Sequence, residues 1–167
     1  MKGFKDNSGW IASRHAMLAV AMTVAMLLLT GCGSRGFDQR VIIPEAQWAM
    51  ENRVPFDVTV NDTVGIYSFG MTLRHLENYR YSNLYVFLHT TLPNGNVMHD
   101  TIQCLLATPD GRWVGKSTGS MRDLRITLNP AMRFPLEGAY HFEIEQAMRE
   151  PILKGISDVG IFIEKKP

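Results

Sequence analysis

The clearest strand signal in the sequence is Ala139-Tyr140-His141-Phe142-Glu143-Ile144-Glu145. Apolar residues occupy every second position in it, with polar residues between them: Tyr140, Phe142 and Ile144 alternate with His141, Glu143 and Glu145. Successive side chains of a β-strand point to opposite faces of a sheet. The stretch is therefore predicted to form a strand with one face on a core and the other in water.

Similar stretches recur along the chain and are separated by turn residues. Alternating or apolar runs lie at residues 56–60, 67–73, 84–91, 97–107, 124–128 and 159–164. Turns are indicated at Pro93-Asn94-Gly95-Asn96 and Pro109-Asp110-Gly111, because asparagine and glycine tolerate the backbone angles of tight hairpins. About eight to nine short strands, with turns every ~8 to 12 residues, predict an all-β fold, an antiparallel β-sandwich.

A leader precedes these strands. Residues 1–15 carry Lys2, Lys5 and Arg14 but one acid, and residues 16–30 are apolar except for two threonines. A helix of that apolar length reaches about 22 Å, less than the ~30 Å that a spanning helix must cross. The pattern is typical of a cleaved signal peptide. The alternative is an uncleaved N-terminal anchor.

The end of the leader predicts lipid attachment. Leu29-Thr30-Gly31-Cys32 matches the bacterial lipobox, in which the thiol of the first mature residue accepts diacylglycerol. We expect residues 1–31 to be a lipoprotein signal peptide, residues 32–40 the lipidated Cys32 and a polar tether, and residues 41–167 the β-sandwich domain. Several acyl chains make such membrane attachment durable, whereas one chain binds only reversibly.

The composition excludes some classes of function. The chain is 46% hydrophobic and 20% charged, which is typical of a folded domain. Removing Lys2, Lys5, Arg14 and Asp6 from the totals of 17 basic and 16 acidic residues leaves 14 and 15, a net charge of −1. A nucleic-acid surface needs clustered basic residues, so no nucleic-acid partner is expected.

The second cysteine is predicted to be structural. If Cys32 carries lipid, Cys104 has no partner for an intramolecular disulfide. Cys104 shares a predicted strand face with Ile102 and Leu106, so we expect it to be buried. A reactive thiol is the less favoured alternative, because no basic neighbour in sequence would stabilise a thiolate.

One constellation could carry chemistry. A hairpin turn centred between Asn94 and Gly95 would place His89 roughly opposite Asp100, with His99 on a diagonal and His141 as a further candidate; these are suitable ligands for a zinc-like ion. The competing interpretation is a solvated strand face. No tight metal motif, nucleophile elbow or phosphate loop occurs. We therefore predict no catalytic residue, no metal site and no cofactor.

Six stretches, together with the lipobox, span nearly the whole chain: Tyr79 to Phe87, Asp100-Thr101, Pro109 to Gly115, Phe134 to Tyr140, Gln146 to Arg149 and Leu153 to Ile161. Their order and spacing resemble those of the gliding-motility lipoprotein family GldH. The resemblance implies a lipoprotein of Bacteroidetes-type bacteria, associated with gliding and with the surface machinery that gliding shares with protein secretion. It supplies no known active-site residues.

Two functions of different class remain. The favoured one is a non-enzymatic accessory lipoprotein that contacts other envelope proteins through an exposed sheet edge or apolar patch. The alternative is a periplasm-facing module that binds glycan or peptidoglycan, for which Trp48 and Trp113 are candidate aromatics, although both can also pack in a core. The outer membrane is the expected location, and its periplasmic face is favoured because residues 33–35 lack the acidic run of some surface-export signals.

Overall fold

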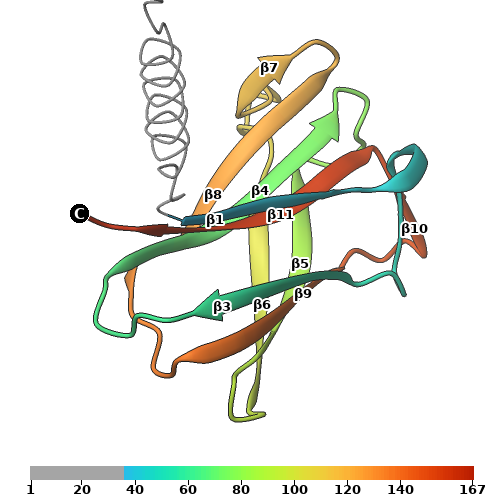
Figure 1. The fold of residues 1–167 in the computed structure, drawn as a ribbon. Coiled ribbons are helices and arrows are strands. Elements are labelled where there is room, and N and C mark those ends of the chain that lie inside the picture. The colour runs from blue at the N-terminus through green and yellow to red at the C-terminus, as the bar shows by residue number, and fades with distance from the viewer. Residues whose placement is uncertain (1–35) are drawn as a thin grey trace, which may run out of the picture. The chain divides into compact units, whose positions relative to one another are not determined.

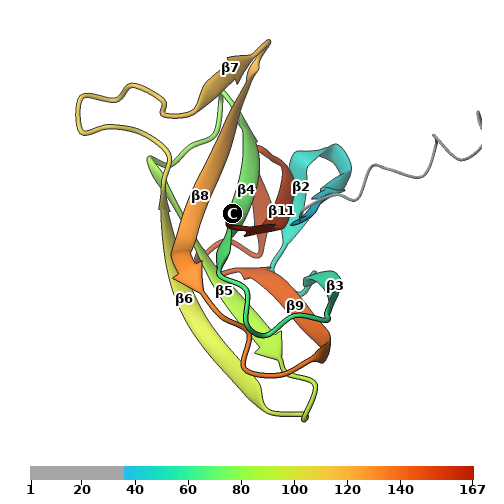
Figure 2. The same cartoon turned by 60° about the vertical axis from the view of Figure 1, so that its left-hand side comes forward.

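The computed structural model describes residues 36–167, and Figures 1 and 2 show their fold. The leader and Cys32 lie outside the described residues. The strands are β1 Gly36–Ile42, β2 Gln47–Ala49, β3 Val54–Val60, β4 Tyr67–Leu76, β5 Asn83–Thr91, β6 Val97–Leu105, β7 Lys116–Thr118, β8 Met121–Met132, β9 Gly138–Gln146, β10 Ile152–Lys154 and β11 Ile156–Lys165. A short 3-10 helix, Pro44–Ala46, joins β1 to β2. Within this range no helix has the length and apolar character needed to cross a membrane.

The strands form two main antiparallel sheets. The five-stranded sheet has the order β1-β11-β4-β8-β7, and the four-stranded sheet has the order β3-β9-β5-β6. A small β10-β2 pair closes one end. The inner faces of the two main sheets share one apolar core, in which Phe69 of β4 stacks on Phe142 of β9 at a ring distance of 5.4 Å. The predicted all-β sandwich is confirmed.

Strand β9, which has the clearest alternation in the sequence, lies as predicted. Tyr140, Phe142 and Ile144 of β9 are at most 3% exposed, while His141 on the other face is only partly covered. β9 sits between β3 and β5, with Phe56 opposite Phe142 in the register of β3. Because β9 is central in its sheet, its apolar face can contact the opposite sheet along its whole length.

The first strand differs from the prediction. Residues 36–40 were expected in the tether, but they form the first five residues of β1, which pairs with β11 from Gly36 opposite Glu164 to Ile42 opposite Asp158. The segment is polar because its outer face carries Asp38 and Arg40, which form ion pairs rather than facing water freely. A strand whose side chains form ion pairs with neighbouring strands does not show the alternation of apolar and polar residues by which strands are predicted.

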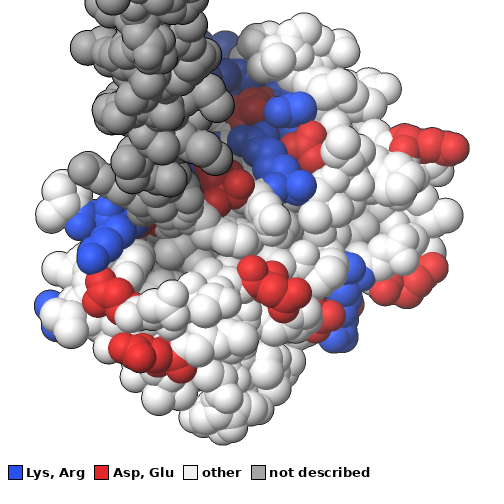
Figure 3. All heavy atoms as spheres, in the orientation of Figure 1, with Lys and Arg blue, Asp and Glu red and all other residues white. Residues whose placement is uncertain are grey.

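Charged side chains cover the outer face of the five-stranded sheet. Arg40 of β1 donates two hydrogen bonds of 3.0 Å to the carboxylate of Asp123 on β8, and Arg74 of β4 lies 3.4 Å from the same carboxylate. Both arginines also contact Asp158 of β11. Burial acts to raise the pKa of Asp123, but its hydrogen bonds to Arg40 and Arg74 hold that pKa below its usual value. Figure 3 shows basic and acidic residues next to one another on the face in view.

A buried aromatic ring completes this outer face. Phe162 of β11 is 1% exposed and lies opposite Gly70 of β4. The guanidinium of Arg125 sits 3.5 Å above the ring centroid, a cation–π contact. A Cβ at position 70 would collide with the ring and with the carbonyl oxygen of Ile126. Gly70 is therefore the residue that lets the ring lie flat on the sheet.

We expect Gly70→Ala to lower the free energy of unfolding by about 1–3 kcal/mol, the usual cost of overpacking a tight site. Urea unfolding followed by circular dichroism would measure it. Ser68→Ala is the matched control, because Ser68 lies on the same strand and face, and its effect should stay within about 0.5 kcal/mol. Equal stability of the two variants would contradict the packing role of Gly70.

A buried histidine lies near the far end of β4. The side chain of His75 is fully buried, and its ring lies 4.7 Å from that of Trp113 and 5.7 Å from that of Tyr79. Its Nδ1 donates a 2.9 Å hydrogen bond to the carbonyl oxygen of Leu76, and its Nε2 has no partner within residues 36–167. Burial lowers the pKa of His75, because a charged ring would lose its hydration.

The lowered pKa makes stability depend on pH. Below pH ~6.5 the unfolded chain binds a proton at residue 75 that the folded chain excludes, so the free energy of unfolding should fall as pH drops from 7.5 toward 5. His75→Gln keeps a donor for the Leu76 carbonyl and should flatten this dependence. The exposed-side control His141→Gln should retain the decline. Urea titrations at several pH values measure this dependence. If the free energy of unfolding of His75→Gln falls with pH as steeply as that of the unsubstituted protein, His75 is not the cause of the decline.

Candidate functional site

The two sheets part along one side of the sandwich and leave a groove between β6 and β8. Its volume is roughly 570 Å³, and Figure 2 shows β6 and β8 running along this side. Both sheets contribute apolar side chains to its floor: Phe69, Leu88, Ile102, Leu128, Met132 and Phe142. An apolar floor of this size is typical of a binding groove.

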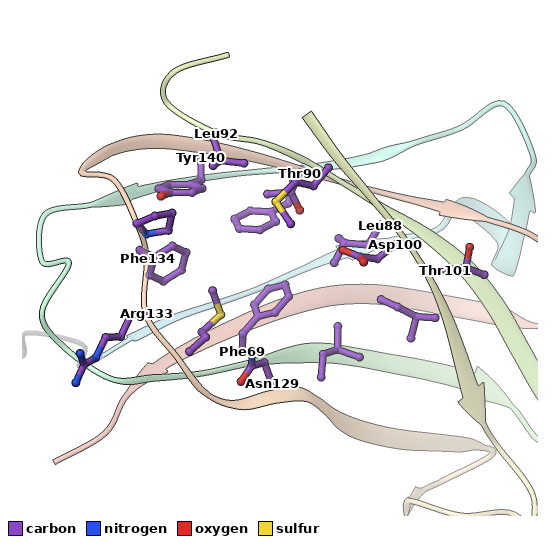
Figure 4. Close-up of a pocket in the computed structure, with 16 residues that line it drawn as sticks. Phe69, Leu88, Thr90, Leu92, Asp100, Thr101, Asn129, Arg133, Phe134 and Tyr140 are labelled. Atoms are coloured by element: carbon purple, nitrogen blue, oxygen red, sulfur yellow. The ribbon is translucent and has the colours of Figure 1, made fainter. Parts of the chain in front are cut away.

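Polar groups are few and lie toward the rim. Asp100 of β6 projects from the groove-facing side of its strand, opposite Leu88. Arg133 follows the end of β8, and Figure 4 shows it at the opposite end of the groove from Asp100, with its guanidinium directed outward. Asn129 lies beside Phe69 in the same view. The groove therefore carries an acid near one end and a base near the other.

Aromatic rings close the end nearer Arg133. Phe134 packs edge-on against Tyr140 at 5.0 Å and against Tyr67 at 5.3 Å. The Tyr140 hydroxyl donates to the carbonyl oxygen of Leu136 at 3.0 Å and accepts from its amide at 3.2 Å. These two bonds fix the loop between β8 and β9, so the shape of this end is set before any ligand binds.

Both lips of the groove are strand edges without a partner in the described part of the chain. β6 pairs with β5 alone. β7 pairs only with residues 121–123 of β8, so β8 from Leu124 to Met132 pairs with β4 alone. An unpaired edge presents a row of backbone donors and acceptors that can add another strand.

The histidines lie elsewhere, on the outer face of the four-stranded sheet. His89 stands directly opposite His99, with their Nδ1 atoms 2.6 Å apart, while Asp100 faces the groove. The predicted pairing of His89 with Asp100 is therefore wrong by one residue. The loop between the two strands, residues 92–96, is centred on Asn94 instead of between two residues: the amide of Leu92 donates to the carbonyl oxygen of Asn96, and Gly95 has a φ of +83°.

The histidines of the candidate metal set contact carboxylates. His89 Nε2 lies 3.2 Å from Glu145, whose carboxylate is also bound by Arg53 at 2.9 Å. His141 pairs with Asp57 at 2.7 Å. Among residues 36–167 no group of three or more histidine, cysteine or carboxylate side chains is arranged to hold a metal ion. What this face can do is form ion pairs across neighbouring strands.

The other candidate side chains are mostly buried. Trp48 is fully buried and its Nε1 donates a 2.7 Å hydrogen bond to the carbonyl oxygen of Asn52. Cys104 is fully buried, and burial raises its pKa to about 11, so the thiol stays protonated at neutral pH. Tyr85 and Phe87 of β5 are instead 37% and 39% exposed, on the same outer face as His89.

The groove was not predicted from the sequence. Its clearest signal is Asp100, a charged residue at an inward-facing position of β6 between Met98 and Ile102. Where the sheets part depends on the pairing of β8 with β4, which are far apart along the chain, and on β6 having β5 as its one partner in the described residues. The alternation within a single strand carries no such information.

Known proteins resemble the chain over most of its length. The profile of the GldH lipoprotein family matches residues 35–163. The "Gliding motility lipoprotein GldH homolog" of Christiangramia forsetii is 29% identical over 160 residues, covering 91% of this chain and 98% of that protein. The "Gliding motility lipoprotein GldH" of Flavobacterium johnsoniae is 31% identical over 153 residues, covering 87% and 94%.

Solved structures resemble the chain only distantly. A structure of infectious bursal disease virus, Gx strain, is 13% identical with a TM-score of 0.34, covering 79% of this chain and 32% of that one. Dimeric latent PorU from Porphyromonas gingivalis is 7% identical with the same TM-score, covering 79% and 13%. Neither likeness adds to the identification. The family profile spans most of the chain, and the chain therefore belongs to the GldH lipoprotein family.

Proposed function

We propose that this protein is a lipid-anchored, non-enzymatic accessory component of the gliding and secretion machinery of the cell envelope, and that its groove binds an extended segment of a protein partner. The observation that carries the proposal is the groove itself, an apolar floor between two unpaired strand edges. The names of the two relatives supply the lipoprotein class and the association with gliding.

An extended peptide suits this groove better than a compact ligand. The edges of β6 and β8 offer backbone hydrogen bonds along their length, and the floor accepts every second side chain of an added strand. Asp100 and Arg133 at opposite ends favour a segment with a basic residue near the first and an acidic residue near the second. Such recognition requires no catalytic group.

The membrane attachment is proposed to run through Cys32. The lipobox ends only four residues before β1 begins at Gly36. With so short a tether the domain must stay close to the membrane that holds the lipid. The outer membrane is the location we favour, with the domain on its periplasmic face, since no acidic run of the kind found in some surface-export signals follows Cys32.

A second candidate function rests on Tyr85 and Phe87. Their rings are partly exposed and lie two residues apart on one strand, so they share the outer face of the four-stranded sheet. Exposed aromatic rings can bind sugar faces, and this pair therefore supports a glycan or peptidoglycan module as the alternative. The groove and this aromatic pair lie on opposite faces of β5, so substitutions can test them separately.

Lipid attachment at Cys32 has a direct test. We expect metabolic labelling with a fatty acid to mark the native protein, and Cys32→Ser to lose the label and leave the membrane fraction. Cys104→Ala is the matched control, because Cys104 is fully buried in the core and should not accept lipid. A labelled Cys32→Ser protein, or one that stays in the membrane pellet, would contradict the assignment.

Partner binding in the groove is tested by two neighbouring residues on β6. Met98 and Val97 are 53% and 52% exposed, but Met98 lines the groove and Val97 points to the opposite face. Met98→Asp should reduce co-purification of a stoichiometric protein partner from solubilised envelopes by about tenfold or more, equivalent to about 1.4 kcal/mol. Val97→Asp should retain it. Neither change is buried, so both variants should fold normally.

Other outcomes of that experiment point elsewhere. Loss of the partner in Val97→Asp but not in Met98→Asp would move the contact to the outer face. If only cell wall or polysaccharide is enriched, and Tyr85→Ser with Phe87→Ser abolishes the enrichment, the glycan alternative is favoured. A gene deletion that leaves spreading and secretion unchanged would remove the link to the gliding machinery.

A further inference from the structure

One end of the sandwich gathers several chain segments beside the start of β1. Gly36 pairs with Glu164 near the end of β11, and Lys165 pairs with Tyr67 at the start of β4. Tyr67 in turn pairs with Met132 at the end of β8. Figure 1 shows the start of β1, the C-terminus and the loop between β3 and β4 at this same end. We call it the Gly36 end.

The loop between β3 and β4, residues 61–66, exposes apolar side chains at the Gly36 end. Val64 is 79% exposed and Ile66 is 40% exposed. The amide of Lys166 donates a 2.8 Å hydrogen bond to the carbonyl oxygen of Ile66, which holds this loop against the end of the chain. The two exposed residues therefore lie next to the last basic residues of the sequence.

This loop is held in one conformation by Asp62. Its carboxylate accepts hydrogen bonds of 2.9 Å from the amides of Val64 and Gly65 and pairs with Lys165 at 2.6 Å. The hydrogen bond from Lys165, followed by those from the two amides, lowers the pKa of Asp62 to about 2. The hydroxyl of Tyr67 donates to the Asp62 carbonyl oxygen at 3.0 Å. Val64 is thus presented on an ordered turn.

The same end also carries basic charge. Lys166 and Arg133 have no acidic partner within the part of the chain that the structure describes, and Lys165 is balanced by Asp62. Arg133 directly follows Met132, which pairs with Tyr67. Basic side chains around exposed apolar ones are the arrangement of a surface that rests on anionic lipid headgroups.

The length of chain before β1 places a lipid surface at this end. Cys32 precedes Gly36 by four residues, and four extended residues span at most about 14 Å. Acyl chains on Cys32 would therefore hold Gly36 within that distance of the membrane surface. The opposite end of β1, at Ile42, lies about 20 Å further along the strand.

We propose that the Gly36 end rests on the membrane, with Val64 and Ile66 inserted into its interfacial layer and Lys166 and Arg133 at the headgroups. This contact rests on the proposed lipid attachment at Cys32. The strands of the five-stranded sheet then point away from the membrane. The start of β8 at Met121 lies about 36 Å along the strand from Met132, because eleven steps along the chain separate the two residues.

The test compares two exposed apolar residues at different ends. Val64 is 79% exposed at the Gly36 end, and Ile42 is 77% exposed at the far end of β1. Val64→Cys and Ile42→Cys are made in the full chain, purified as the lipoprotein and labelled with a nitroxide. Cys104 is buried with a pKa of about 11, so it should not react. Each protein is placed in vesicles of phosphatidylethanolamine and phosphatidylglycerol.

We expect the Val64 label to be several-fold more accessible to oxygen, and several-fold less accessible to a water-soluble nickel complex, than the Ile42 label. Co-flotation with the vesicles, combined with equal accessibilities of the two labels, would overturn the membrane contact while leaving the lipid anchor intact. Failure of both proteins to float would overturn the lipid anchor, and the contact with it. The two failures are therefore distinguishable.

Discussion

One apolar core holds the two sheets together, and the stacked rings of Phe69 on β4 and Phe142 on β9 are part of it. Both residues lie on inner faces, and each is at most 7% exposed. Twisted sheets that are held together at one line of contact diverge away from it. The same two rings form part of the floor of the groove, so the packing that closes the sandwich also sets the depth at which it opens.

Much of the fold follows from the sequence because single strands reveal themselves by alternation. β9 is the clearest case: its buried residues Tyr140, Phe142 and Ile144 are those that the pattern places inward. β1 was missed because ion pairs to Asp123 and Arg125 replace apolar burial on its outer face. The extra strands β2, β7 and β10 have three residues each, too few for a period of two to stand out.

The candidate site follows from the sequence much less well, because it depends on register and on pairing between distant segments. A one-residue error in the predicted register of the β5–β6 hairpin places Asp100 on the wrong face, opposite His89 instead of Leu88. The true register places Asp100 in the groove and His89 beside Glu145. Alternation with a period of two shows which residues of one strand share a face. The loop type sets the register between two strands, and so decides which residues of the neighbouring strand lie opposite them.

The two proposed surfaces constrain each other. The groove runs along β8, and β8 extends away from the Gly36 end, where Met132 lies beside Tyr67. If that end rests on the membrane, a segment added to the edge of β8 would run roughly along the membrane normal, with its acidic residue at Arg133 near the headgroups. A partner bound in this way would therefore have a chain that rises from the same membrane, or descends toward it, rather than one that lies along its surface.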